Sequence, residues 1–392
     1  MRKYSLKTVI VLVLLASALI CIITGLIFNR LTGFGTSDFH QVQRYAELLR
    51  KIDRYYIGDY TAEDVTDMAL SAAVYALGDR WSYYMTDDEY VQYINSSNNQ
   101  FVGIGIITSQ DEQERGAAVL RVYEGSPAEE AGLKAGDVIV AVDGESVAGF
   151  TTEQLREVIL REPRQSVLLT VLSDGMESDV TVICDYVYVP PVSCELLDDG
   201  IGLIDIDNFD TGAYDGFKSA YEELLGEGAS SFIIDVRNNP GGYVNELQKI
   251  LDYMLGECET FVYVSRTGKE TVLTSDSDMQ DHPTVVLFNK DSYSAAEYFA
   301  AVLSEYEYAE TVGTHTTGKG RTQITVDLMD EGALHISSNE YVTPKRVSLY
   351  DAGGIAPDYE VELDEPSEEL LVYDMLPRDS DTQLQKAIEI LK

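Results

Sequence analysis

The chain has 392 residues, of which 67 are acidic and 28 are basic, so its formal net charge is -39. A surface this negative repels phosphate backbones and anionic lipid headgroups, which argues against nucleic acid as a partner. With 45% hydrophobic residues and 30 glycines, the composition is typical of globular domains and excludes a disordered chain or a fibre. The length is enough for two or three such domains.

The N-terminus predicts a membrane anchor. Three basic residues precede an uncharged apolar run at 8–28, namely Arg2, Lys3 and Lys7. The run is close to the roughly 20 residues that a helix needs to cross the hydrocarbon core. A cleaved signal peptide has a shorter apolar core and small residues at its cleavage site, which the segment after residue 28 lacks. We therefore expect a cytoplasmic tip at 1–7, a single transmembrane helix at 8–28, and the remainder on the extracellular or periplasmic side of the cell membrane.

Two helices are expected in the region 36–97. Apolar residues recur at spacings of three and four at 42–52 and again at 65–73. Gly78 is a suitable stop for the second helix. The region is either a helical linker next to the membrane or a dimerisation arm that would pair two copies of the chain in a homodimer. The sequence does not separate these two roles.

A small β-rich domain is predicted at 98–185. Short apolar runs at 119–122, 138–142 and 167–171 alternate with glycine-containing turns, as strands do. An amphipathic helix is expected at 151–161, where a threonine can cap the first turn. Roughly 90 residues is an ordinary size for a small domain.

The remainder, 186–392, predicts an α/β core domain with a helix at its C-terminal end. The strands are expected at 201–206, 231–236 and 284–288, and the helices that follow them at 215–225, 244–255 and 295–303. Repeated strand–loop–helix units favour a sheet covered by helices. In such cores the loops at the carboxyl ends of the strands hold the chemistry.

The loop after the strand at 284–288 contains Ser294 at the point where the next helix begins. A hydroxyl there faces the positive end of the helix dipole and free backbone N–H groups, which favour developing negative charge. Ser292 or Ser294 could equally be an ordinary helix cap, a role that serine often fills. On its own this stretch does not decide between a nucleophile and a cap.

Lys319 lies between Gly318 and Gly320, which give the backbone freedom to enter a tight site. A lysine amine that is buried beside a serine can lose its charge and act as a general base. One alternative is a lysine in a solvated loop, and another is a serine hydrolase in which His315 and an aspartate replace it. A phosphate loop is not supported, because the pattern GxxxxGK[ST] is absent.

A third stretch follows the strand at 231–236 and ends in Gly241 and Gly242. Two glycines after a strand allow backbone N–H groups to point into a site, as an oxyanion hole requires. A structural turn is the alternative for any Pro-Gly-Gly sequence.

The sequence offers little for a metal or a disulfide. It has four histidines and neither an HExxH motif nor a CxxC pair, so no metal site is expected. Cys21 follows Ile20, which is too large for the position before a lipid-attachment cysteine. Cys184 and Cys194 are close enough in sequence to pair in an oxidising compartment, but free buried thiols are expected for them and for Cys258.

Taken together, these stretches resemble the carboxyl-terminal processing proteases, the tail-specific peptidases of family S41, from about residue 40 onward. The motifs are DVRNNPGG at 235–242, NKDSYSAAE at 289–297, TGKGRTQ at 317–323 and GGIAPD at 353–358. The family's serine, lysine and glutamine correspond to Ser294, Lys319 and Gln323, and the steps of 25 and four residues between them agree with the family's arrangement. The resemblance implies a ClpP/crotonase-like α/β protease core with a mixed sheet and helices.

The domain at 98–185 resembles the PDZ domain that the family carries as an insertion. The loop that would cradle a peptide carboxylate consists of Gly103, Ile104, Gly105 and Ile106. The run at 124–137 resembles the SPA…AGLKxGD turn of these domains. In this mode, N–H groups of the loop capture the carboxylate while the peptide adds a strand to the sheet edge. The alternative, in which the glycines only form a turn, is weakened by the second motif.

Two positions depart from the family pattern. Tyr293 stands in the nucleophile run where smaller residues are usual, and its ring either narrows the site or packs behind the loop. Ala296 stands where serine is common. Neither departure removes a catalytic group.

The resemblance implies a membrane-anchored serine endopeptidase that recognises the C-terminal tails of protein or peptide substrates and needs no cofactor. Neutral Lys319 would take the proton of Ser294, and Gln323 would orient the lysine by a hydrogen bond. Two rivals remain. One is a non-catalytic PDZ scaffold on an inactive protease fold, and the other is the serine hydrolase that uses His315 as its base.

The expected oxyanion hole combines the backbone N–H of Ala295 with one from Gly241 or Gly242. Donors of this kind stabilise the negative charge that develops on the carbonyl oxygen during acyl transfer. The resemblance supplies this assignment only in outline, since which glycine donates depends on the local backbone.

Overall fold

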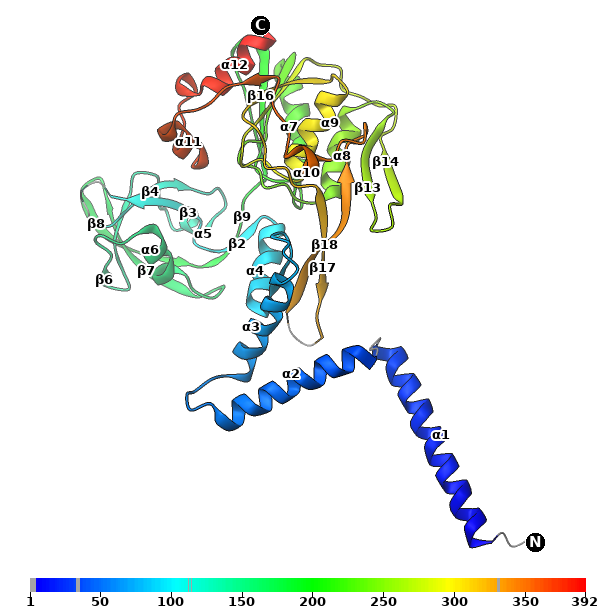
Figure 1. Ribbon diagram of the computed structural model, residues 1–392. Helices are drawn as coiled ribbons and strands as arrows, with labels where there is room; N and C mark the ends of the chain where they lie inside the picture. Colours follow the sequence, from blue (N-terminus) through cyan, green and yellow to red (C-terminus); the bar gives the residue numbers. More distant parts are fainter. Residues whose placement is uncertain (1–4, 33–35, 112, 114, 330–331) are drawn as a thin grey trace. The chain divides into compact units, whose positions relative to one another are not determined.

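The computed structural model describes residues 5–32, 36–111, 113, 115–329 and 332–392. It separates into two units, the first ending at Thr66 and the second beginning at Asp67 (Figure 1). The first unit contains α1 (Leu6–Thr32), α2 (Thr36–Tyr55) and the start of α3 (Ala62–Tyr75). Within α1, the stretch Lys7–Gly25 is long and apolar enough to cross a membrane, with a mean hydropathy of 2.7.

Residues 100–188 of the second unit form a small β domain. Its elements are β2 (Gln100–Gly103), β3 (Ile106–Gln110), β4 (Ala117–Val122), α5 (Pro127–Glu130), β5 (Val138–Val142), β6 (Glu145–Ser146), α6 (Thr152–Ile159), β7 (Ser166–Ser173), β8 (Met176–Ile183) and β9 (Asp185–Tyr188). The antiparallel sheet has the order β3-β4-β5-β7-β8, with β6 paired to β5. Strands β2 and β9 pair with each other, so the chain enters and leaves the domain through one two-stranded ribbon.

The core domain contains all the elements that follow the small β domain. They are β10 (Val192–Leu196), a 3-10 turn (Asp198–Gly200), β11 (Ile201–Ile206), α7 (Ala213–Glu227), β12 (Ser231–Asp235), α8 (Val244–Met254), β13 (Glu259–Val264), β14 (Glu270–Thr274), β15 (Thr284–Phe288), α9 (Ala295–Glu305), β16 (Ala309–Gly313), β17 (Arg321–Asp327), β18 (Ala333–Val342), α10 (Leu349–Ala352), β19 (Tyr359–Glu360), α11 (Glu365–Val372), a second 3-10 turn (Arg378–Ser380) and α12 (Thr382–Leu391). The main sheet has the order β10-β11-β12-β15-β16-β19. All its pairs are parallel except that of β10 with β11.

Helices cover both faces of this main sheet. Strands β12 and β15 are buried at every position, as the strands of a parallel sheet between two helical layers are. Alternate residues of a strand face opposite sides. Ile234 and Val286 therefore pack with α7, α8 and α9, whereas Ile233 and Val285 pack against Leu384 of α12.

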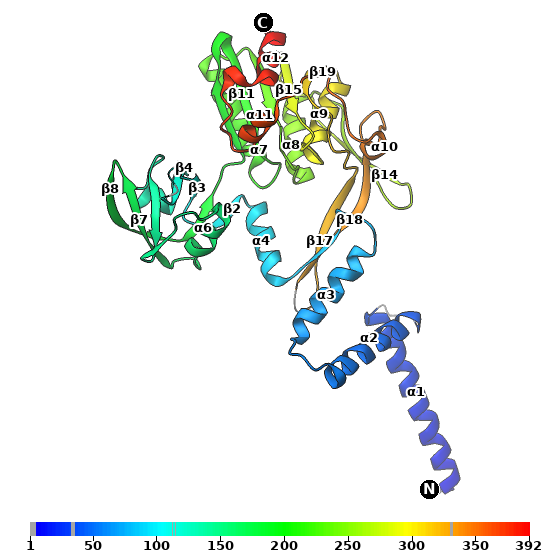
Figure 2. The ribbon, with the colours of Figure 1, turned by 60° about the vertical axis from the view of Figure 1, so that its left-hand side comes forward.

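A second sheet, which the sequence did not predict, has the order β1-β18-β13-β14, with β17 on β18. Strands β17 and β18 form a long hairpin (Figure 2). Strand β1 (Tyr83–Met85) precedes α4 (Asp87–Ser97) and the small β domain in the chain, yet it pairs with β18, Tyr83 lying opposite His335. This pairing brings the segment around residue 80 to the C-terminal half of the core.

A buried arginine ties the C-terminal helix to the main sheet. Arg237 follows β12, and its guanidinium donates to Asp235, to Asp381 and to Gln383, the last two at 2.8–3.0 Å. All four side chains are buried. Removing one partner of such a buried pair costs about 3–5 kcal/mol, because the remaining charge is left uncompensated. The network therefore fixes α12 against the end of β12, next to the loops that carry the candidate chemistry.

Three cysteines were expected to be free buried thiols, and they differ in their burial. Cys184, Cys194 and Cys258 are unpaired with one another, Cys184 is buried, and the other two are half-buried. Burial raises the pKa of the Cys184 thiol, which keeps it protonated and unreactive.

Candidate active site

Ser294 lies at the turn between β15 and α9, and its backbone is strained. Its φ is +60° and its ψ is -121°, a conformation that residues other than glycine adopt only where their surroundings enforce it. Nucleophilic serines are presented in this way, on a sharp turn from a strand to a helix that exposes the hydroxyl above the sheet. Ser294 also stands at the N-terminal end of α9, where the positive end of the helix dipole lies.

Two neighbouring loops hold this turn in place. The buried Ser292 donates from Oγ to the carbonyl of Val236 at 2.7 Å and accepts from the N–H of Asn289 at 2.9 Å. Asn289 and Asn238 exchange two hydrogen bonds of 2.7 and 2.9 Å between the loops. These loops meet because they follow the adjacent parallel strands β12 and β15. Ser292 is therefore a brace of the loop, and Ser294 is the serine that begins the helix.

Gly241 approaches the serine turn too closely to carry a side chain. A Cβ atom on Gly241 would lie 2.7 Å from the Cβ of Ser294 and 2.9 Å from the backbone nitrogen of Ala295, and its φ is +94°. Ala295 begins α9, so its N–H has no partner within the helix. Because position 241 is a glycine, the backbone of the DVRNNPGG loop can lie close to the N–H of Ala295.

The two glycines differ in what their N–H groups do. The N–H of Gly241 donates to Oδ1 of Asn239 at 2.8 Å. The adjoining bridge to Phe209 uses the carbonyl of Gly241 and the N–H of Tyr243. The N–H of Gly242 lies outside both interactions. The N–H of Gly241 is therefore already used. Of the two glycines, Gly242 is the one whose N–H remains as a candidate oxyanion donor.

The carboxylate of Glu297 joins the serine turn to the lysine loop. Glu297 is fully buried in the first turn of α9. Its Oε1 accepts from the N–H of Ser294 at 3.2 Å and from that of Lys319 at 2.6 Å. Its Oε2 accepts from the N–H of Gly318 at 2.9 Å and from the hydroxyl of Thr316 at 2.8 Å. Burial raises the pKa of Glu297, and these hydrogen bonds to the carboxylate oppose that rise.

Tyr341 of β18 adds a second link between the two stretches. Its hydroxyl donates to the carbonyl of Lys319. Burial, and then the charge of Glu297, raise the pKa of this phenol well above its usual value, while a hydrogen bond with the side chain of Ser294 opposes the rise. The phenol therefore stays neutral and remains a donor.

The amine of Lys319 lies against aromatic rings. Its Nζ is 4.5 Å from the ring centroid of Trp81 and 5.8 Å from that of Tyr293, within cation–π range. The side chain is half-buried. Burial lowers the pKa of Lys319 to about 8, although the charges of Glu297 and Asp79 act in the opposite direction. A substantial fraction of the amine is therefore neutral near pH 8.

One cavity of about 520 Å³ brings the predicted residues together. Its lining includes Gly241, Gly242, Ser294, Ala295, Lys319 and Gln323. His315 is not among the described residues that line this cavity. Its ring is exposed, and its Nδ1 lies 3.0 Å from the carbonyl oxygen of Thr316. The histidine that does line the cavity is His335. Its pKa is lowered to about 4 by burial and by the charge of Lys319.

Gln323 differs from its expected role. Its amide donates to the carbonyl of Arg321 at 2.9 Å and to Oγ of Ser337 at 3.2 Å. Within the described residues, no hydrogen bond joins Gln323 to Lys319. The reason is local, because Gln323 sits on β17 opposite Ser337 of β18 and its amide is used across that strand pair.

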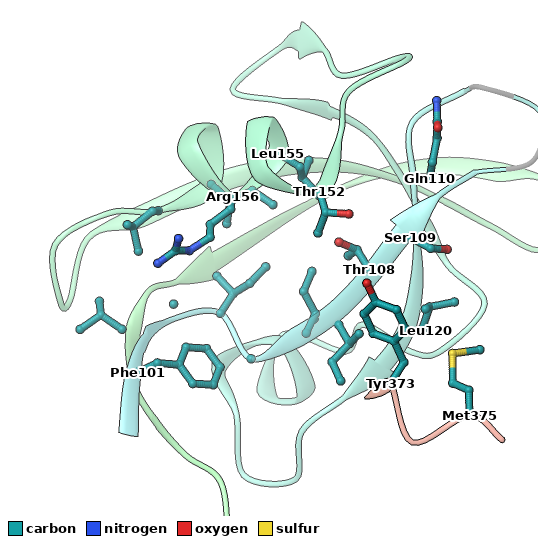
Figure 3. Close-up of a pocket in the computed structure, with 18 of the residues that line it drawn as sticks. Phe101, Thr108, Ser109, Gln110, Leu120, Thr152, Leu155, Arg156, Tyr373 and Met375 are labelled. Carbon is teal, nitrogen blue, oxygen red and sulfur yellow. The ribbon is translucent and has the colours of Figure 1, made fainter. Parts of the chain in front are cut away.

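A second cavity, of about 610 Å³, lies in the small β domain between β3 and α6 (Figure 3). All four residues of the expected carboxylate loop, 103–106, line it. Gly105 has a φ of +83°, and a Cβ there would lie 2.3 Å from that of Ser126, so only glycine fits. Strand β3 is at the edge of its sheet, and β4 is its one partner strand among the described residues. Tyr373 and Met375, which follow α11, also line the cavity (Figure 3).

Sequence reasoning missed three residues of the first cavity and its frame: Trp81, Glu297 and Tyr341. Glu297 carried a usable signal, since it stands three residues after Ser294 in the S-x-x-E pattern of a capping box. Trp81 and Tyr341 carried none, because their proximity to Lys319 depends on the pairing of β1 and β17 with β18.

Comparison with known proteins finds similar families and relatives. Residues 200–361 match peptidase family S41, and residues 119–173 match the PDZ domain. A "Probable CtpA-like serine protease" of Staphylococcus saprophyticus is 27% identical over 361 residues, which cover 90% of this chain and 72% of the relative. The protein of the same description from Staphylococcus aureus strain COL is 26% identical over 368 residues, covering 92% and 73%.

A solved structure is similar in fold. The crystal structure of a candidate S41 protease from Bacteroides fragilis NCTC 9343 superposes with a TM-score of 0.58, covering 83% of this chain and 89% of that chain. The identity is 19%, so this likeness concerns the fold alone.

Replacing Gly241 by alanine tests the close approach to the serine turn. We expect Gly241→Ala to slow the labelling of Ser294 by a fluorophosphonate probe on the order of 100-fold, because the added methyl must displace the serine. Gly226→Ala is a matched control within α7, since a Cβ there meets nothing within 4 Å. Equal labelling rates for the two variants would show that the contact with Gly241 does not position the serine.

Proposed function

We propose that this chain, an S41 peptidase with a PDZ domain, is an endopeptidase in which Ser294 is the nucleophile and Lys319 the general base. One observation carries the proposal. A serine on a strained strand-to-helix turn and a half-buried lysine with a pKa lowered to about 8 line the same cavity. A base poised near the working pH is what general base catalysis requires.

The chemistry proceeds in two steps. Neutral Lys319 takes the hydroxyl proton of Ser294 as its Oγ attacks the scissile carbonyl carbon, and the resulting ammonium gives that proton to the leaving amine. This breaks the peptide bond and leaves an acyl ester on Ser294. Lys319 then takes a proton from water, whose oxygen attacks the ester. The carboxylic acid departs and the proton returns to Ser294.

The negative oxygen of each tetrahedral intermediate needs preorganised donors. We assign this role to the N–H groups of Ala295 and Gly242, because the N–H of Gly241 is used by Asn239. Gln323 makes no hydrogen bond to the amine of Lys319 within the described residues. It lines the same cavity as Lys319, and its amide is held by Ser337 on the neighbouring strand.

Substitution of the two proposed catalytic residues tests this assignment. Ser294→Ala and Lys319→Ala should each reduce cleavage of casein by the full-length chain in mild detergent by at least about a thousandfold. His315→Ala should cleave casein at the wild-type rate, since the ring lies outside the cavity lining that the structure describes. Rates are followed by release of fluorescent fragments from labelled casein.

The rivals predict different patterns. If His315→Ala is inactive while Lys319→Ala cleaves, histidine is the base. If the wild-type chain binds tails but never cleaves them, the chain is a non-catalytic scaffold. Activity in Ser294→Ala would contradict both serine mechanisms.

We further infer that the small β domain binds the free C-terminal tails of protein substrates. Support comes from the loop at 103–106, which borders a partly apolar cavity, and from the position of β3 at the edge of its sheet. A tail would add a strand to β3 and place its carboxylate at the N–H groups of the loop. Tyr373 and Met375 share this cavity, so an arriving tail meets them there.

A pair of peptides tests tail recognition. A fluorescent peptide that ends in an apolar residue should bind the full-length Ser294→Ala chain at least about tenfold more tightly as the free acid than as the C-terminal amide, because charge-assisted hydrogen bonds are lost with the carboxylate. Binding is measured by fluorescence anisotropy. Equal affinity of the two peptides would exclude recognition of the chain end.

We also infer that α1 anchors the chain in the cell membrane with its N-terminus in the cytoplasm. The stretch Lys7–Gly25 has the length and apolarity of a span, and the basic residues before it favour the cytoplasmic side. Protease added to intact spheroplasts that express the chain should then digest the region beyond residue 36 while a cytoplasmic marker survives. Digestion only after lysis would show that the region beyond residue 36 is in the cytoplasm, which contradicts the proposed orientation.

A further inference from the structure

The segment just before β1 forms a turn that is pinned to β18. Asp79 accepts from the N–H of Trp81 at 3.1 Å and from the hydroxyl of Ser82 at 2.7 Å. The hydroxyl of Ser82 in turn accepts from the N–H of Ser337 at 3.0 Å. Ser337 is also the residue to which Gln323 donates. The turn is thus joined by hydrogen bonds to the strand pair that forms a wall of the catalytic cavity.

This turn places the indole of Trp81 at the proposed base. The ring centroid lies 4.5 Å from Nζ of Lys319 and 5.4 Å from the ring centroid of Tyr293, with an interplanar angle of 35°. The guanidinium carbon of Arg80 lies 4.2 Å from the same indole. In the part of the chain that the structure describes, the Lys319 amine makes no ion pair or hydrogen bond. The rings of Trp81 and Tyr293 are the partners that the structure gives this amine.

We propose that Trp81 is a positioning residue for the base, and that its indole and the ring of Tyr293 form a seat that holds the Lys319 amine at the cavity wall and limits its contact with water. The inference rests on the proposed role of Lys319 and extends it to a segment outside residues 200–361, the range that matches the peptidase family.

The seat has two opposing effects on the amine. The negative face of an aromatic ring attracts the ammonium form. The same ring surface excludes water, which disfavours the ammonium form. A leucine at position 81 would keep most of the exclusion and lose the attraction, whereas an alanine would lose both and admit water. The two substitutions should therefore move the ionisation of Lys319 in opposite directions.

Other ionisable groups around the amine come from four segments of the chain. They are Glu297 on α9, Asp79 and Arg80 in the turn, His335 and Tyr341 on β18, and Tyr293 before α9. The pKa of His335 is about 4, and those of Tyr293 and Tyr341 are raised. Glu297 remains in any variant of Lys319, so its contribution can be subtracted.

The first experiment uses the fact that Trp81 is the single tryptophan of the chain. Selectively excited tryptophan emission of the full-length wild-type chain in mild detergent is titrated between pH 6 and 10. We expect a change with its midpoint near pH 8, where Lys319 loses its proton, and no such change in Lys319→Met. A wild-type titration that matches Lys319→Met would overturn the seat.

The second experiment measures kcat/KM for casein peptides against pH. Because only the neutral amine acts as base, the wild-type rate should rise with pH and level off above about 8. In Trp81→Ala the midpoint should move up by about one pH unit, and in Trp81→Leu it should move down. A purely structural role would lower the rate in both variants and leave both midpoints at the wild-type pH, which would also overturn the seat.

The two experiments separate the inference from the proposed function. If the emission titrates with Lys319 but Lys319→Met still cleaves, the seat stands and the base assignment fails. If Lys319→Met is inactive but the emission does not respond to Lys319, the base assignment stands and the seat fails.

Discussion

The geometry of the candidate active site depends on one buried carboxylate. Glu297 accepts hydrogen bonds from the backbone of Ser294 and from that of Gly318 and Lys319. The two stretches are separated in the sequence by α9 and β16, so neither can position the other through local structure. A buried donor left without an acceptor costs about 1–3 kcal/mol, and these N–H groups are partly buried. The same bonds help to maintain the strained φ of Ser294, which would otherwise relax.

The parts of the fold that the sequence predicted are those set by local pattern. The strands at 201–206 and 284–288 have the expected limits, and that at 231–236 is one residue shorter, because continuous apolar runs between glycine-rich turns identify buried strands without reference to partners. The helices after them differ by at most two residues at their ends, where fraying and caps decide. Strand β1 was missed because three residues have no period, and its existence depends on pairing with β18 far along the chain.

The candidate site divides in the same way. Ser294, Lys319 and Gly242 could be named from motifs, since each stands in a stretch whose residue types suit its chemistry. The hydrogen bond of Gly241 to Asn239 and that of Gln323 to Ser337 could not, because both follow from backbone geometry that only the assembled loops define. The contact of Trp81 with Lys319 is even harder to predict from the sequence, because it requires β1 to pair with β18 in the second sheet.

Tyr293 acquires a physical explanation from this contact. Smaller residues are usual at this position in the family, and the sequence left open whether the tyrosine ring narrows the site or packs behind the loop. Its ring lies against Trp81, so the larger side chain is accommodated by an aromatic partner from a distant segment. A change at one of these two positions is therefore coupled to the other, as residues in direct contact are.

The pairing of β2 with β9 also bears on how the chain folds. Strand β1 must find β18 across an intervening domain, and closing a loop of that length carries an entropy cost that grows with the number of free residues. Because β2 and β9 lie side by side, the domain between them folds into a unit whose two ends are already together. Once it has formed, the chain outside it behaves as though a short hairpin joined α4 to β10. The insertion therefore lengthens the sequence by a domain while adding to the core only the closure entropy of a short connection.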